Sequence, residues 1–111
     1  MKVADLVQKY GLSVFTKNVV LDKKIEGGYV SDLLSDVMGN ARENEVWITL
    51  QTHRNVAAIA SLKDLAAVIL VKELVPDQDT LEHCESEEIP LLGTSLSTFE
   101  MAGKLWSDLN R

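Results

Sequence analysis

Two short runs of almost uninterrupted apolar residues limit what this chain can fold into. Residues 46–50 read Val-Trp-Ile-Thr-Leu, and residues 65–71 read Leu-Ala-Ala-Val-Ile-Leu-Val. A strand with one face in water alternates apolar and polar residues, whereas a strand of a parallel sheet is covered on both faces and is apolar throughout. The two runs therefore predict buried strands at residues 46–50 and 66–71.

Helical patterns alternate with these strands in the second half of the chain. Residues 54–65 carry small side chains that let a helix lie close to a sheet, and another helix follows Pro76. Residues 89–92 predict a third strand, and the capping-box pattern at residues 97–100 opens a last helix. The apolar side of that helix is expected to consist of Phe99, Ala102, Leu105, Trp106 and Leu109.

The order strand–helix, met three times in succession, builds parallel sheets through right-handed crossovers. The sequence therefore predicts an α/β fold, in which β-α-β-α-β-α units form a mainly parallel sheet with helices packed on it. At 111 residues the chain has the usual size of one domain, and we expect a single domain over residues 1–111.

The first half of the chain has shorter patterns. Val3, Leu6, Val7 and Tyr10 are spaced as one face of a helix, which Gly11 is expected to end in a left-handed conformation. Residues 13–16 and 19–21 predict two strands joined by a tight turn. The pair at residues 27–28, Gly-Gly, is interpreted as a bend rather than a close backbone approach, and Ser31 as the cap of a helix ending at Gly39-Asn40.

Charge and cysteine content exclude several classes of protein. Lys and Arg number 11 against 17 Asp and Glu, a net charge of −6 that is unfavourable for binding nucleic acid. Cys84 is the one cysteine, so no internal disulfide can form and a reducing, cytoplasmic location is expected. The longest apolar run, residues 65–71, is far shorter than the roughly 20 residues of a membrane span.

Polar residues follow the predicted strands, at the edge where parallel sheets bind ligands. The hypothetical ligand-binding residues are Thr52, His53, Arg54, Asn55, Thr94 and Ser95. The first four stand at the start of a helix, where backbone N–H groups and the helix dipole favour an anion. In the alternative interpretation, Thr52 or Asn55 only caps the helix while His53 and Arg54 are solvated.

No arrangement in the sequence predicts catalysis, a metal or a cofactor. His53 could serve as a general base, but no nucleophile elbow or phosphate-binding glycine–lysine loop accompanies it. His83 and Glu87 are one helical turn apart, yet zinc requires three or four ligands, and Cys84 between them is expected in the core. Apolar residues at helical spacing are interpreted first as core and otherwise as a contact with a second subunit: Leu33, Leu34, Val37, Met38 and Trp106.

A family resemblance is carried by residues 28–38 and 46–53, by Pro76-Asp77, and by residues 89–92 and 98–100. In these segments the chain resembles stand-alone DRTGG-domain proteins. The resemblance extends over residues 3–109. Related domains lie between regulatory CBS modules in some inorganic pyrophosphatases and before the kinase domain of HPr kinase/phosphorylase. The resemblance implies an α/β fold and a regulatory or dimer-forming module, with catalysis left to other domains.

The chain departs from the motif that names this family. Asp-Arg of that motif aligns with His53-Arg54, and Thr-Gly-Gly with Val71-Lys72-Glu73, so that only Arg54 is kept. This implies a changed ligand specificity or no pocket. We expect a non-catalytic, ligand-sensing homodimer that binds an anionic metabolite or nucleotide. Because small family members occur beside iron-hydrogenase genes, the alternative is an assembly subunit of a redox enzyme without a small-molecule site.

Overall fold

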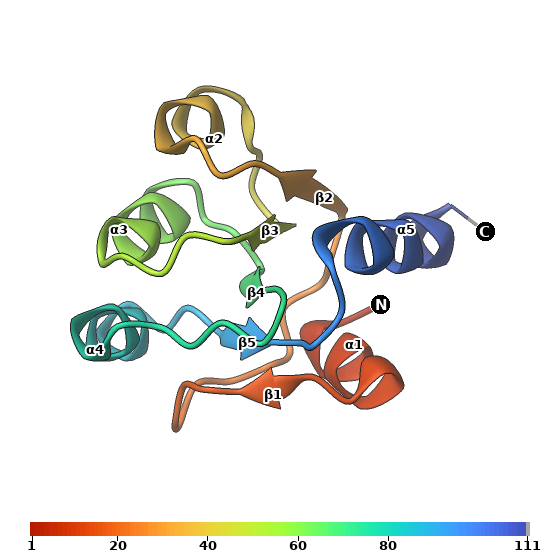
Figure 1. The fold of residues 1–111 in the computed structure, drawn as a ribbon, viewed down its shortest axis with the longest axis horizontal. Helices are drawn as coiled ribbons and strands as arrows, with labels where there is room; N and C mark the ends of the chain where they lie inside the picture. The colour runs from red at the N-terminus through yellow and green to blue at the C-terminus, as the bar shows by residue number, and fades with distance from the viewer. Residues whose placement is uncertain (111) are drawn as a thin grey trace.

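Within residues 1–110, which the computed structural model describes, five strands form one sheet in the order β1-β5-β4-β3-β2 (Figure 1). Arg111, the last residue of the predicted domain, lies outside the described residues. β2 to β5 are parallel, and β1 is antiparallel to β5. The predicted α/β fold with a mainly parallel sheet is therefore confirmed. The strands are β1 (Ser13–Val14), β2 (Gly27–Val30), β3 (Glu45–Thr49), β4 (Ala67–Leu70) and β5 (Leu91–Gly93).

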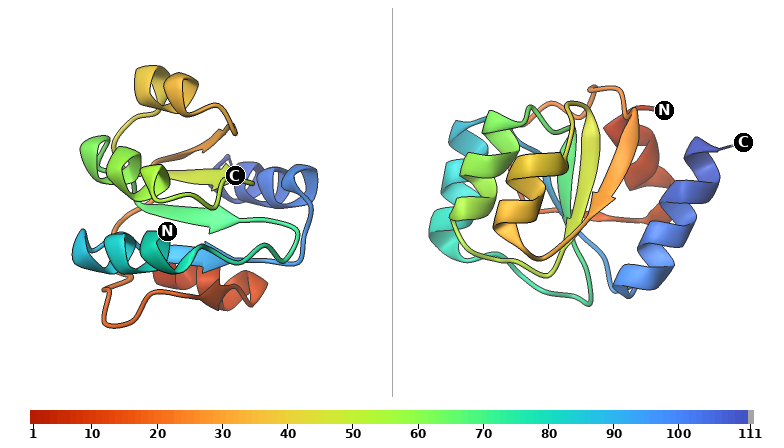
Figure 2. Two further views of the ribbon diagram at one scale, coloured as in Figure 1. Left: turned by 60° about the vertical axis from the view of Figure 1, so that its left-hand side comes forward. Right: turned by 90° about the horizontal axis from the view of Figure 1, so that it is seen from above.

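Helices cover both faces of the sheet. Figure 2 shows α2, α3 and α4 side by side on one face, with α1 and α5 on the other. Each face encloses its own core: Val46 and Ile48 of β3 are buried with α1 and α5, whereas Trp47 between them is buried with α2 to α4. The helices are α1 (Val3–Tyr10), α2 (Leu34–Asn40), α3 (Asn55–Leu62), α4 (Gln78–Ser86) and α5 (Thr98–Leu109).

Residues 19–21 form no strand, so the predicted hairpin is wrong. β1 pairs with β5 instead, with Ser13 opposite Gly93. The backbone after β1 runs beside the start of α1, where Leu21 O accepts a hydrogen bond of 2.8 Å from Ala4 N. Local β propensity is therefore overridden by contacts with a distant strand and with α1.

The glycine pair at residues 27–28 lies in β2, and its interpretation as a bend is wrong. A Cβ atom on Gly28 would lie 2.8 Å from Leu105 Cδ2 of α5. The missing side chain thus lets α5 lie close to the strand, which is the alternative that the sequence left open. Ser31 does not cap α2 either. The N-cap is Leu33, whose N–H donates to Ser31 Oγ at 3.2 Å.

The ends of α1 and α5 form as predicted. Gly11 ends α1 with a left-handed φ of 60°. Ser97 is the N-cap of α5: its Oγ accepts from Glu100 N at 3.2 Å, and Glu100 Oε1 accepts from Ser97 N at 3.1 Å. The hydrogen bond from the Ser97 backbone holds the pKa of the Glu100 carboxyl below its usual range.

The buried side of α5 differs from the predicted one. Met101 and Leu105 are in the core, whereas Phe99 and Trp106 are 88% and 70% exposed. Leu33 and Met38 near α2 are also exposed, so their interpretation as core residues is wrong. Helical spacing identifies residues that share a face, but not which neighbour covers that face. None of the helices within residues 1–110 has the length and apolarity to cross a membrane.

Replacing Gly28 with alanine is expected to lower the free energy of unfolding by about 1–3 kcal/mol, because the new methyl group must displace the packed Leu105 side chain. Gly103→Ala is the matched control. No atom lies within 4 Å of its added Cβ, and alanine in a helix interior is worth up to about 1 kcal/mol over glycine. Urea denaturation measures both variants, and equal effects would contradict the close packing of α5 on β2.

Glu100→Gln tests the capping box through its pH dependence. Because the folded-state pKa of Glu100 is lowered, its ionised form stabilises the fold above the ordinary carboxyl value of 4.5. That contribution is lost as the pH falls through the lowered value. We expect wild type to be the more stable protein at pH 7 and the difference in melting temperature to shrink as the pH falls below 4.5. A difference independent of pH would contradict this assignment.

Candidate functional site

The four parallel strands end at the same edge of the sheet, after Val30, Thr49, Leu70 and Gly93. The loops that follow these strands form the edge where open parallel sheets bind ligands. This carboxyl edge also contains all six candidate residues named from the sequence. Its geometry therefore decides which of them can act together.

Asp32 connects the loops after β2 and β3 through hydrogen bonds. Its Oδ1 accepts hydrogen bonds from Thr49 Oγ1 at 2.9 Å and from Leu50 N at 2.7 Å, and its carbonyl accepts from Gln51 Nε2 at 2.7 Å. Next to it, Trp47 Nε1 donates to Ser31 O at 2.8 Å. No sequence pattern marks Asp32, because its hydrogen-bond partners become neighbours only when β2 pairs with β3.

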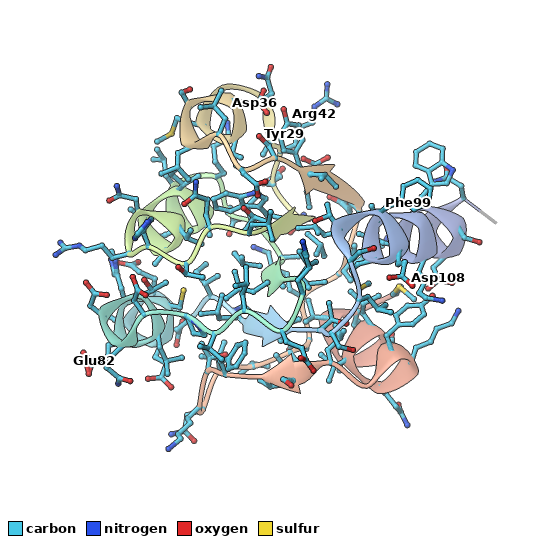
Figure 3. All side chains as sticks on the ribbon, viewed as in Figure 1. Tyr29, Asp36, Arg42, Glu82, Phe99 and Asp108 are labelled. Carbon is cyan, nitrogen blue, oxygen red and sulfur yellow. The ribbon has the colours of Figure 1, made fainter. Side chains whose placement is uncertain are left out.

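A second group of hydrogen bonds connects β2 with α2. Tyr29 Oη donates to both carboxylate oxygens of Asp36, at 2.8 and 2.9 Å (Figure 3). Asn40 Nδ2 donates to the same carboxylate at 3.1 Å. Asp36 has its acceptors occupied by α2 and β2, so this group fixes the helix on the sheet rather than offering a ligand site.

Residues 52–55 lie against the start of α4. Thr52 O accepts hydrogen bonds from Thr80 Oγ1 at 2.7 Å and from Asp77 N at 3.3 Å. His53 Nδ1 lies 3.5 Å from Asp77 Oδ2, with both side chains mostly in solvent. Neither Thr52 nor Asn55 caps α3, because the N-cap is Arg54 and no side chain bonds there. The solvated position expected for His53 in the alternative interpretation is the observed one.

The turn after β4 has an unusual backbone. Lys72 and Glu73 have φ values of 59°, in the left-handed region that favours glycine. Their N–H groups donate at 2.9 Å to Leu96 O and Thr94 O, which ties this turn to the loop after β5. These are the positions that the sequence aligned with the two glycines of Thr-Gly-Gly. The left-handed backbone gives a physical reason for glycines in that motif.

Thr94 and Ser95 belong to another part of the edge. They line a hollow of about 790 Å³ together with Lys9 and Tyr10 of α1 and Lys104 of α5. Thr94 Oγ1 accepts a hydrogen bond from Leu96 N at 3.2 Å. The six predicted residues therefore divide between the α3–α4 side and the α1–α5 side of the sheet. The lysines were missed because they lie on the first and last helices, with no shared sequence motif.

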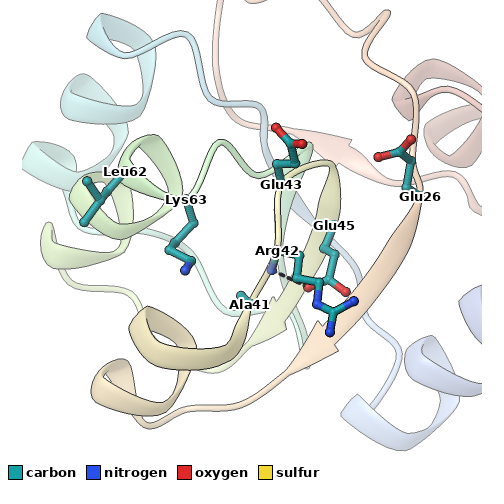
Figure 4. A pocket seen from close by; sticks show the side chains of 7 residues that line it. All are labelled: Glu26, Ala41, Arg42, Glu43, Glu45, Leu62 and Lys63. Carbon is teal, nitrogen blue, oxygen red and sulfur yellow. Dashed lines mark hydrogen bonds between the residues drawn. The ribbon is translucent and has the colours of Figure 1, made fainter.

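A hollow at the amino edge and a histidine–glutamate pair on α4 are weaker candidates for a ligand or metal site. Arg42 and Glu45 help to line a hollow at the opposite, amino edge of the sheet, where Glu45 Oε1 accepts from Arg42 N at 2.7 Å (Figure 4). On α4, His83 Nε2 and Glu87 Oε1 are 3.8 Å apart, and residues 1–110 bring no three His, Cys, Asp or Glu side chains together as a metal site. Cys84 is buried as predicted, which raises the pKa of its thiol to about 12.

No protein-family model and no curated protein matches the chain. Among solved structures, its fold is similar to the CBS and DRTGG domains of the regulatory region of Clostridium perfringens pyrophosphatase, a structure that contains the activator diadenosine tetraphosphate. The TM-score is 0.69 at 13% identity, covering 93% of this chain and 44% of that chain. The match shows a common fold, consistent with the DRTGG-domain resemblance, and the chain spans less than half of that regulatory region.

Glu73→Gly is expected to raise the free energy of unfolding by about 0.5–1 kcal/mol, because glycine adopts the left-handed conformation without the Cβ strain of glutamate. Glu43→Gly removes the same charge from a loop position whose φ is not positive, and should leave stability unchanged or lower it. Thermal unfolding of both variants checks the sign, and stabilisation by both would point to charge rather than backbone conformation.

Proposed function

We propose that this chain is a non-catalytic regulatory domain that senses an anionic metabolite or nucleotide at the carboxyl edge of its sheet. The observation that carries the proposal is the fold similarity to the regulatory region of a pyrophosphatase, whose structure contains a nucleotide activator. The polar loops of the carboxyl edge, with the candidates Thr52 to Asn55, Thr94 and Ser95, supply the ligand contacts.

The surroundings of the reactive side chains support a role without catalysis. His53 is 71% exposed, and Asp77 stands 3.5 Å from its ring without excluding water. A general base works best in a cleft that fixes both base and substrate. Burial keeps the Cys84 thiol protonated, which deprives it of nucleophilic character. A single free cysteine also suits a reducing cytoplasm.

The proposal includes homodimerisation through β2 and α5. β2 pairs with β3 on one side only, so its other edge presents unpaired backbone groups. Val30 on that edge is 48% exposed. Val30 and Trp106 of α5 both line a groove between the helix and the strand. A second copy is the occupant that we favour, because an open edge strand pairs with its own copy around a two-fold axis.

Light scattering at micromolar concentration tests the dimer. We expect twice the 12.3 kDa mass of the chain, and a shift toward the monomer in Trp106→Ser, which removes apolar contact area. Leu62→Ser is the matched control, since Leu62 is 69% exposed on α3 at the other face of the sheet. A wild-type monomer would contradict the dimer. A larger enzyme recovered with that monomer would support the alternative, an assembly subunit of a redox system.

Thermal shift with nucleotides and phosphorylated metabolites tests ligand sensing. A ligand that binds the folded state at 100 times its dissociation constant adds about 2.7 kcal/mol of stability, and thus raises the melting temperature. We expect at least one such compound, and weaker stabilisation in variants of the carboxyl edge. The sensing function falls if no anionic compound in the set changes the melting temperature. Turnover that disappears in His53→Ala would instead make the chain an enzyme.

A further inference from the structure

The hollow between α1, β5 and α5 combines charged, hydroxyl and aromatic groups at one end of the carboxyl edge. Its volume of about 790 Å³ is within the roughly 300–1,000 Å³ of small-molecule pockets. Thr94 and Ser95 are its only members among the candidates named from the sequence. The cations and aromatic rings of its lining come from α1, from α5 and from the residue that follows β1: Lys9, Tyr10, Lys104 and Phe15.

The lining of this hollow contains two lysines although the whole protein is acidic. Lys9 and Lys104 line it together with one acidic residue, Glu73, in a chain with a net charge of −6. Lys9 Nζ is held by Asp108 Oδ1 at 2.6 Å. Lys104 interacts electrostatically with Glu100, one helical turn earlier on α5. Within residues 1–110 it has no carboxylate within 4.0 Å, so its ammonium group is better placed than that of Lys9 to meet an anion.

Asp108 holds one wall of the hollow in place. It lies between α5 and α1 (Figure 3), where it accepts a short hydrogen bond from Tyr10 Oη as well as the ion pair of Lys9. Its side chain is only 4% exposed. The ammonium groups of Lys9 and Lys104 lie 5.5 and 5.7 Å from the centroid of the Tyr10 ring, within the range of cation–π attraction. Both positive charges are therefore gathered around one fixed ring.

The opposite wall is apolar and aromatic. Phe15 borders the hollow from the other face of the sheet, where it packs against the core under α2 to α4, and a Cβ atom on Gly93 would be 2.6 Å from its Cε2. Leu74 and Val75 extend this wall. Phe15 is partly buried, and an aromatic ring at the border of a hollow can stack on a nucleobase.

Two serine hydroxyl groups also line the hollow. The side chains of Ser13 and Ser95 line the hollow and have no hydrogen-bond partner within residues 1–110. Each can donate to a phosphate or ribose oxygen. The lining thus combines lysine ammonium groups, serine hydroxyl donors and an aromatic ring in one hollow.

We propose that this hollow is the ligand site of the domain and that it takes a nucleoside phosphate, with the phosphate at Lys104 and Ser95 and the base against Phe15. The inference rests on the proposed sensing function and specifies its site and ligand class. It assigns the binding role to α1 and α5, in place of His53 and Arg54 on the α3–α4 side.

Amide NMR titrations with ADP, adenosine and pyrophosphate test this assignment on the full chain. ADP is expected to shift the amide signals of residues 9–13 and 93–96, and to bind more tightly than adenosine or pyrophosphate, each of which engages one wall. Lys104→Gln should weaken ADP about two- to fivefold, the worth of one exposed ion pair. Lys24→Gln removes the same charge from an exposed lysine outside the hollow lining and should leave ADP affinity unchanged.

The failures of this inference and of the proposed function can be told apart. Shifts centred on residues 52–55, with affinity lost in Arg54→Ala and kept in Lys104→Gln, would overturn this site while the sensing function stands. Pyrophosphate bound as tightly as ADP would overturn the nucleotide class. No response to ADP, together with stabilisation by another anionic metabolite, would also reject the inference alone. No response to any anion would reject both.

Discussion

Burial of the central strands on both faces is the constraint on which the rest of the structure depends. All four residues of β4 are buried, and β3 sends Trp47 to one core and Ile48 to the other. A sheet of this kind is stable only when helices cover both sides. That requirement places α3 and α4 on one face and α1 and α5 on the other. It also leaves the loops at the two ends of the strands as the segments free to carry polar groups.

The parts of the fold that sequence reasoning predicted are those determined by residues close together in the sequence. Gly11 ends α1 because its own backbone is left-handed, and Ser97 opens α5 through partners three residues away. The segment at residues 19–21 has strand-like side chains, yet its backbone partners come from α1. Trp106 fits a helical stripe, but the position of α5 on β2 turns it outward. In each of these errors, tertiary contacts determine the structure, and the local sequence pattern carries no information about those contacts.

The candidate site follows the same division. Thr94 and Ser95 were identified because a strand end can be read from a sequence, and both line a hollow. Lys9 and Lys104 could not be identified in this way, because their proximity exists only after the first and last helices pack on the same face. Lys72 and Glu73 are a related case. Their left-handed backbone has the conformation that favours glycine, at the two positions that the resemblance aligns with the glycines of the DRTGG motif.

The two edges of the sheet are unequal. β1 offers two residues, and they run antiparallel to their neighbour, whereas β2 offers four. In the proposed dimer, pairing at β2 would occupy the longer edge of both copies, and the edges left over would be too short to template another strand. Growth of such a sheet would therefore stop after one step. Self-association through β2 would not lead to the open-ended polymerisation that threatens a protein with two long free edges.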